Sequence, residues 1–228
     1  YQTYRRLVTA ELYDTPLPHQ IVLLDGYTGT AKTALLPHLQ DQGVQVLDLE
    51  GMADHRGSLL GAMPCGQPSQ KMFETRLAQA ISKLDPNKPT IVEAESSKVG
   101  KINLPPALWS KMIEAPRVSL VASINARTVF LTSAYDDILR DPATVRDRLA
   151  PLRRVRGHAV VDRWQALQDA GDLTGLARAL VTDHYDPAYD KSRSEKSVRQ
   201  LATVTLDMMD EPGLIDAATK IVRSLKAV

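Results

Sequence analysis

A lysine and a threonine that follow a glycine-containing turn are the residues of this chain best suited to hold a phosphate. The segment "LLDGYTGTAKTALLPHL" (23–39) has an apolar run, a turn rich in Gly and Thr, and then Lys32-Thr33. Such a turn surrounds an anion with backbone N–H groups, while the lysine adds a charge and the threonine hydroxyl can bind Mg²⁺. We therefore expect a diphosphate-binding loop made of Gly26, Tyr27, Thr28, Gly29, Thr30, Ala31, Lys32 and Thr33.

One position of this loop departs from the usual pattern of a phosphate loop, G-x-x-x-x-G-K-[ST]. Ala31 stands where the second glycine belongs. We expect Ala31 to be among the first helical residues, with right-handed backbone angles that any residue can adopt, so that only its small size matters. The alternative is an ordinary strand–turn–helix in which Lys32-Thr33 is incidental.

Carboxylates follow two apolar runs that are expected to be strands. "QVLDLE" ends with Asp48 and Glu50, and "TIVEAES" contains Glu93 and Glu95. Residues two apart share a face of a strand, and the carboxyl ends of parallel strands border the crevice where ligands bind. We take Lys32, Asp48 and Glu93 as catalytic candidates, and Thr33 with Glu93 as candidate Mg²⁺ ligands. Helix capping or solvated strand ends are the alternative.

The elements around these residues alternate between strand and helix. Apolar runs at 20–26, 44–50, 88–96 and 117–124 are typical of strands, and 33–43 and 69–84 of helices. This predicts an α/β fold, a P-loop NTPase-like, doubly wound and mainly parallel sheet, in a domain at 1–133. From about residue 134 we expect helices only, including 195–209, in a helical C-terminal part (134–228) packed on the core.

Composition sets limits on the class of protein. The 228 residues are 43% hydrophobic and 24% charged, as expected of a soluble globular protein, and the formal net charge is +1. No apolar run reaches the roughly 18 residues of a membrane span, so we expect no membrane association. Cys65 is the only cysteine, which excludes an internal disulfide and suits a reducing cytoplasm. Because the chain starts at Tyr1 rather than Met, we expect it to belong to a longer protein.

Several longer strings resemble one family. "DLEGMADHRGSLLG" (48–61), "QPSQKMFE" (67–74), "VEAESSKVGKINLP" (92–105) and "HYDPAY" (184–189) are similar to the phosphate-loop domain of bacterial tRNA 2-selenouridine synthase. The resemblance implies that a wobble 2-thiouridine of tRNA is S-geranylated from geranyl diphosphate. Selenium from selenophosphate then replaces the geranylthio group. It also implies an N-terminal rhodanese domain or subunit, which this chain lacks, and for which Cys65 is no substitute.

Two residues after the second expected strand could assist the diphosphate. His55 could donate a proton, and Arg56 could make a bidentate phosphate contact. The alternative for both is a structural role in a loop flanked by glycine.

The basic residues at 140–158 could contact tRNA. Arg146, Arg153 and Arg156 recur at spacings that suit one face of a helix, with Arg154 nearby, and Lys98 and Lys101 follow the third strand. The alternative is a solvated helix face paired with neighbouring carboxylates. We expect Trp164 in the core and "HYDPAY" in a turn.

Two other functions fit the same sequence. A nucleotide or small-molecule kinase would have a similar loop and sheet, with the arginines of 140–156 as a lid over its nucleotide. A non-catalytic tRNA-docking module would need neither Lys32-Thr33 nor the acidic strand ends.

Overall fold

A five-stranded parallel sheet forms the centre of the molecule. The computed structural model describes residues 2–193 and 199–226. The strands are β1 (Gln20–Gly26), β2 (Gln45–Leu47), β3 (Pro89–Glu93), β6 (Arg117–Val121) and β7 (Gln200–Thr205), in the order β2-β3-β1-β6-β7. The central strand β1 is apolar along almost its whole length because helices cover both of its faces. Its carboxyl end, at Gly26, leads directly into the predicted phosphate loop.

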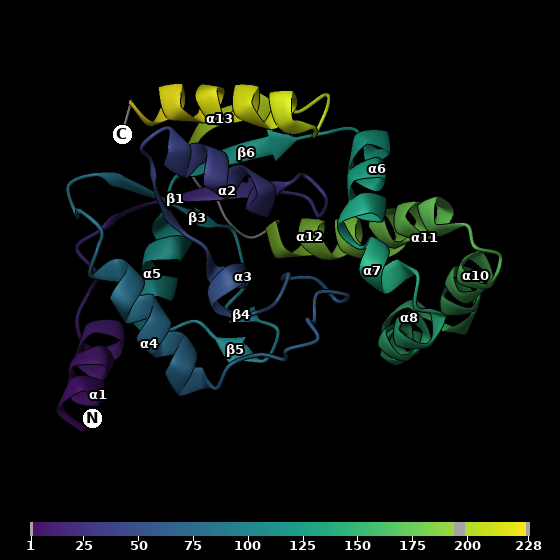
Figure 1. The fold of residues 1–228 in the computed structure, drawn as a ribbon, viewed down its shortest axis with the longest axis horizontal. Helices are drawn as coiled ribbons and strands as arrows, with labels where there is room; N and C mark the ends of the chain where they lie inside the picture. Colours follow the sequence, from purple (N-terminus) through teal and green to yellow (C-terminus); the bar gives the residue numbers. More distant parts are fainter. Residues whose placement is uncertain (1, 194–198, 227–228) are drawn as a thin grey trace.

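Helices pack on both faces of the sheet, as the doubly wound prediction requires. On one face lie α2 (Lys32–Asp41) and α13 (Glu211–Leu225), which contact each other (Figure 1). On the other lie α4 (Gln70–Ile81) and α5 (Pro106–Glu114). Each face has its own buried apolar cluster, so the predicted α/β fold class is confirmed.

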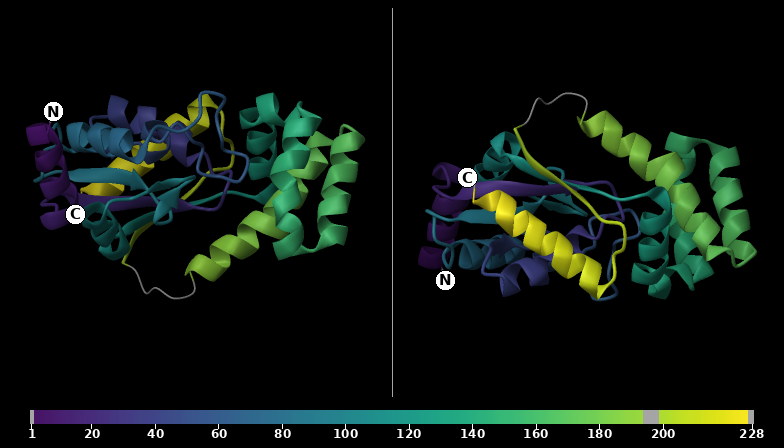
Figure 2. Two further views of the ribbon diagram at one scale, coloured as in Figure 1. Left: turned by 90° about the horizontal axis from the view of Figure 1, so that it is seen from below. Right: turned by 90° about the horizontal axis from the view of Figure 1, so that it is seen from above.

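A group of helices stands beside the sheet, between β6 and β7 in the chain (Figure 2). It comprises α6 (Ile124–Ala134), α7 (Asp136–Leu139), α8 (Pro142–Leu149), η2 (Ala150–Leu152), α9 (Arg153–Arg156), α10 (His158–Asp169), α11 (Leu173–Leu180), η3 (Val181–Tyr185) and α12 (Asp186–Arg193). Trp164 is fully buried in a third apolar cluster among these helices, as expected for a core residue.

The expectation of helices alone after residue 134 is wrong. Residues 200–205 of the expected helix 195–209 form β7, which pairs in parallel with β6, while 195–198 lie outside the described residues. Val204 is buried while Thr203 and Thr205 are exposed, which is the alternation of a strand. Three consecutive β-branched residues favour the strand over the helix. The predicted helical part therefore contains an edge strand of the central sheet.

The second strand is shorter than expected. β2 ends at Leu47, and Asp48 begins α3 (Leu49–Met52), where its carboxylate accepts a hydrogen bond from the Gly51 N–H at 2.7 Å. Aspartate favours this role because its short side chain can satisfy a free N–H group at the start of a helix. Asp48 and Glu50 consequently do not share the face of a strand.

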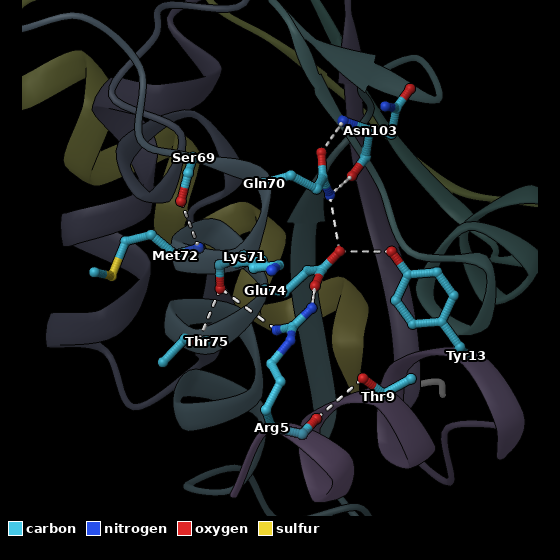
Figure 3. Close-up of polar contacts among 10 residues, drawn as sticks. All are labelled: Arg5, Thr9, Tyr13, Ser69, Gln70, Lys71, Met72, Glu74, Thr75 and Asn103. Carbon is cyan, nitrogen blue, oxygen red and sulfur yellow. Dashed lines mark hydrogen bonds and ion pairs between the residues drawn. The ribbon is translucent and has the colours of Figure 1, made fainter. Parts of the chain in front are cut away.

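The N-terminal segment is tied to α4 by one buried carboxylate. Glu74 accepts hydrogen bonds from Arg5 of α1 (Gln2–Thr9), from Tyr13 of η1 (Ala10–Asp14) and from Gln70 (Figure 3). Gln70 also pairs with the backbone of Asn103 in a small hairpin, β4 (Lys98–Val99) and β5 (Ile102–Asn103). These contacts hold α1 away from the carboxyl ends of the strands.

Among the described residues, no helix has the length and apolar character that a membrane crossing demands.

Candidate functional site

A cleft of about 570 Å³ lies where the carboxyl ends of β1 and β3 meet the helical group. Every residue of the predicted diphosphate loop lines it except Tyr27. The Lys32 ammonium donates to the Gly26 carbonyl at 2.8 Å, which keeps its charge over the loop. Tyr27 turns away, and its ring centroid lies 4.5 Å from that of Tyr189. The loop thus forms one wall of a cleft that is large enough for a small phosphorylated ligand.

Ala31 does not have the backbone that we expected. It has φ 58° and ψ 29°, in the left-handed region, and it immediately precedes α2. The chain reverses here so that the loop can close before the helix starts, which is why glycine is usual at this position. An alanine in this conformation costs about 1 kcal/mol, and its methyl group is buried. Small size alone is therefore not what the position requires.

The Thr33 hydroxyl lies between two carboxylates. Its Oγ1 is 2.6 Å from Glu93 Oε1 and 3.1 Å from Glu50 Oε2. Glu93 is fully buried at the end of β3, and its Oε2 has no hydrogen-bond partner among the described residues. No group of three or more His, Cys, Asp or Glu suited to a metal ion occurs in the described part of the chain. One or two carboxylates, a hydroxyl and phosphate oxygens are nevertheless the ligands that Mg²⁺ takes, so Thr33 and Glu93 fit it.

Three carboxyl groups around Thr33 resist ionisation. Burial raises the pKa of Glu50 to about 8, and the neighbouring Glu95 charge adds to the shift. Burial, and then the charge of Glu50, raises the pKa of Glu93 to about 8. The pKa of Glu95 rises to about 7 for the same kinds of reason, with Glu93 as its charged neighbour. A positive charge beside these carboxyl groups, from a cation or from the Lys32 ammonium, lowers their pKa values and favours their ionised forms.

Of the other candidates, Arg56 lines the cleft but His55 and Asp48 do not. Arg56 makes two hydrogen bonds of 3.0 Å to the Asp137 carboxylate, so a phosphate would compete with Asp137 for it. His55 is buried, and its Nδ1 accepts from the Gly57 N–H at 3.0 Å. Burial, and then the charge of Arg148, lowers the pKa of His55. This geometry favours a structural role for His55, and capping of α3 for Asp48.

The predicted basic face is not one helix face. Arg146 is in α8, whereas Arg153 and Arg156 are in α9 beyond the turn η2, because Pro151 interrupts the helix. Arg146 pairs with Asp169 and Arg153 with Asp162, at 3.0 and 2.6 Å.

The remaining basic candidates differ in their surroundings. Arg156 donates to the side chain and the carbonyl of His184. Arg154 is exposed and makes no ion pair with a described residue. Lys98 and Lys101 are exposed on the hairpin of β4 and β5. None of these six basic side chains lines the cleft.

The sequence did not indicate the residues that fasten α12 to the phosphate loop. Arg127 is buried and makes a bidentate pair with Asp186 at 2.8 and 2.6 Å, and it also donates to the Thr28 carbonyl. Tyr189 donates to Asp25, the residue before Gly26. The expected turn at 184–189 is wrong, since η3 runs directly into α12. Pro187 is the second residue of α12, directly after the π-helical turn η3. In the sequence, this segment stood out only because "HYDPAY" resembles a string of the family named above.

A family model for the tRNA 2-selenouridine synthase AAA domain matches residues 19–144, from the start of β1 to the first turn of α8. The chain belongs to the tRNA 2-selenouridine synthase family. The match includes the phosphate loop, Glu50, Glu93 and Glu95, but not His184, Tyr185 and Tyr189, which also line the cleft.

Curated relatives of this family resemble the chain over most of its length. The tRNA 2-selenouridine synthase of Marinobacter nauticus is 31% identical over 86% of this chain and 60% of its own. The one from Verminephrobacter eiseniae is 36% identical over 78% of this chain and 55% of its own. The one from Pseudomonas syringae pv. syringae is 31% identical over 87% of this chain and 61% of its own. The chain therefore spans about 60% of the length of the relatives that it matches.

Proposed function

We propose that this chain is the phosphate-loop part of a tRNA 2-selenouridine synthase and that its cleft binds geranyl diphosphate. The geranyl group is transferred to the sulfur of a wobble 2-thiouridine in tRNA. The observation that carries the proposal is a cleft lined by Lys32 and Thr33, with the buried Glu93 carboxylate 2.6 Å from the Thr33 hydroxyl, in a chain that belongs to this family. The proposed substrates come from the family resemblance.

In this transfer the thiouridine sulfur forms a bond to C1 of the geranyl group while the C1–O bond breaks. The bonding electrons leave with diphosphate, and the base loses its N3 proton to solvent. The loop N–H groups, the N-terminus of α2 and the Lys32 ammonium stabilise the departing charge. For this, Lys32 exchanges its contact with the Gly26 carbonyl for the ligand. Mg²⁺, when bound, would be held by Thr33 and Glu93 and would neutralise charge on the diphosphate oxygens.

Replacement of the geranylthio group by selenium, with selenophosphate as the donor, completes the proposed reaction in the cytoplasm. We assign this step to cooperation with a rhodanese domain or subunit, in the part of the relatives' length that the chain does not span. Of the six basic candidates, Arg154, Lys98 and Lys101 are exposed and make no ion pair with a described residue, so we expect these three to contact tRNA phosphates.

The test is mass spectrometry of 2-thiouridine tRNA after incubation with this protein and geranyl diphosphate. We expect a product that has gained one geranyl group. Lys32→Ala should abolish the product without changing the melting temperature, while the matched control Lys83→Ala, in the exposed turn that follows α4, should leave the product unchanged. ATP turnover without tRNA would favour a kinase instead. Tight tRNA binding without any transfer would favour a docking module.

A further inference from the structure

One side of the cleft is hydrocarbon. Phe130, Leu131 and Ala134 of α6 face it, and Leu59 and Tyr135 extend the same surface. We call these five residues the α6 wall. Polar groups also line the cleft, among them Lys32 and Thr33 at the start of α2, Glu50 of α3, Arg56, Glu95 and His184 of η3. The cleft therefore has a charged part and an apolar part.

The α6 wall touches the phosphate loop itself. A Cβ built on Gly29 would lie 2.8 Å from Leu131 Cδ1, so the loop backbone and this side chain are in direct contact. Gly29 has φ 87°, which also favours glycine at this position. If a ligand places a phosphate on the loop N–H groups, the hydrocarbon of α6 therefore lies next to the atoms that follow the phosphate.

The wall offers little to the edge of a nucleobase. Phe130, Leu131, Ala134 and Leu59 carry no polar side-chain atom. The Tyr135 hydroxyl is already 2.8 Å from Ser58 Oγ, so its ring is what remains for a ligand. A nucleobase packed on these five side chains would gain no hydrogen bond from the four apolar ones, whereas a hydrocarbon chain needs none.

The wall also joins parts of the apolar interior that are otherwise separate. Phe130 packs against the cluster between the sheet and α2, and Leu131 belongs to a small cluster with α11. Leu59 and Tyr135 pack against the cluster of the helical group. These side chains are held in place from behind, so the wall is a formed surface and not a loose set of exposed residues.

We propose that the α6 wall binds the hydrocarbon chain of an allylic diphosphate and sets the chain length that the site accepts. The inference rests on the proposed function, because it requires the diphosphate group to lie on the phosphate loop. The ligand extends from the loop at Gly29 across Leu131 and along Phe130 and Ala134, with Leu59 and Tyr135 beside it. Its C1 atom lies between the loop and the wall, where an incoming thiouridine sulfur can reach it.

The test compares the binding of inorganic diphosphate and of dimethylallyl, geranyl and farnesyl diphosphates by calorimetry. For the unchanged protein we expect geranyl diphosphate to bind at least about 100-fold more tightly than inorganic diphosphate, since several methylene groups become buried. Ala134→Phe fills the wall from the last residue of α6, an exposed position where a larger side chain does not disturb the fold. It should weaken geranyl diphosphate at least about tenfold and shift the preference to dimethylallyl diphosphate.

Two controls separate this inference from the proposed function. Binding of inorganic diphosphate to Ala134→Phe should stay within about twofold of the unchanged protein, because the loop is intact. Ser133→Phe, at the neighbouring exposed residue that does not line the cleft, should leave all four affinities unchanged.

Two results would overturn the α6 wall while leaving the phosphate loop standing. One is equal affinity of the unchanged protein for geranyl and inorganic diphosphate. The other is an Ala134→Phe variant with the chain-length preference of the unchanged protein. A protein that binds none of the four compounds would overturn the proposed function itself.

Discussion

Ala31 shows that a backbone angle, rather than side-chain size, sets the demand at this position of the loop. Its φ of 58° is favourable for glycine, whereas the methyl group of alanine is buried against the cluster under α2. Ala31→Gly therefore relieves backbone strain, but it loses a packed methyl and loosens the unfolded chain. These effects oppose one another, and we expect the free energy of unfolding to change by less than about 1 kcal/mol.

Ala31→Val is the contrasting change. A β-branched residue is strongly disfavoured at positive φ, and the Ala31 side chain is already buried next to α2. We expect the free energy of unfolding to fall by about 2 kcal/mol or more, measured by urea denaturation. Equal stabilities of the Gly and Val variants would show that the left-handed backbone at residue 31 is not maintained in solution.

The carboxyl cluster at Thr33 predicts a dependence of stability on pH. Glu50, Glu93 and Glu95 bind protons more tightly in the folded protein than in the unfolded chain, so their protonated forms favour folding. That contribution is complete below their ordinary pKa of 4.5 and is lost as the pH rises to about 8. Without Mg²⁺, the melting temperature should fall between pH 5 and pH 8.

The pH dependence of the melting temperature can be compared between the unchanged protein and the variant Glu50→Gln. The amide keeps the shape of the side chain but has no charge to repel Glu95 and Glu93, so the fall in melting temperature between these pH values should become smaller. Circular dichroism at several pH values would follow it. An identical pH profile for the variant and the unchanged protein would mean that the cluster is ionised without cost.

At the scale of elements, the placement of α12 depends on Arg127. This buried guanidinium joins Asp186 of α12 to the Thr28 carbonyl of the phosphate loop, and it lies 5.0 Å from the centre of the Tyr27 ring. Arg127→Met removes the charge and leaves Asp186 beside apolar groups. Breaking a fully buried pair costs about 3–5 kcal/mol. Because the Asp186 side chain is 21% exposed, we expect a loss of about 2–3 kcal/mol in the free energy of unfolding.

The same helical group contains a matched control. Asp136, the first residue of α7, forms an exposed ion pair with Arg140, which directly follows that helix. Arg140→Ala should cost less than about 0.5 kcal/mol in the same urea titration, because solvent screens such pairs. Comparable losses for Arg127→Met and Arg140→Ala would contradict the role that we give to Arg127.

Some elements of the fold could be predicted from the sequence and others could not. The strands at 20–26, 88–96 and 117–124, and the loop between β1 and α2, were predictable because short apolar runs and a Gly-Thr turn report local structure. β7 was not predictable, because the apolar residues of 195–209 also fit the period of a helix. The α6 wall, Arg127 and Tyr189 could not be predicted either. Their role exists only when segments more than 90 residues apart in the chain meet, as Arg127 and Thr28 do.

At the scale of the whole molecule, positive charge lies on both sides of the loop 55–62. Arg148 donates to the carbonyls of Leu60 and Ala62, which ties α8 to one side of this loop. A Cβ built on Gly100 would lie 2.8 Å from His55 Cδ2, which places the hairpin with Lys98 and Lys101 against the same loop. With a net charge of only +1, binding of tRNA would depend on such a local arrangement.

Salt dependence distinguishes the arginines. Arg154→Gln should lower the slope of log K for tRNA against log salt by about 0.7–0.9, because the Arg154 charge is exposed, makes no ion pair with a described residue and so releases a counterion from the RNA on binding. Arg146→Gln should change the slope by less, since Asp169 lies 3.0 Å away and already balances it. Filter binding across a salt series measures both. A larger effect for Arg146 than for Arg154 would contradict this assignment.

The late position of β7 in the chain has a consequence for synthesis on the ribosome. β6 is complete at Val121, but its neighbour in the sheet follows only at Gln200, after all of the helical group. Until then the edge of β6 presents unpaired N–H and C=O groups, and the face later covered by α13 is open to water. The nascent chain thus passes through a stage in which the helical group can fold while the sheet is still able to pair with another copy. Slow translation between residues 122 and 199 would prolong that stage and favour aggregation.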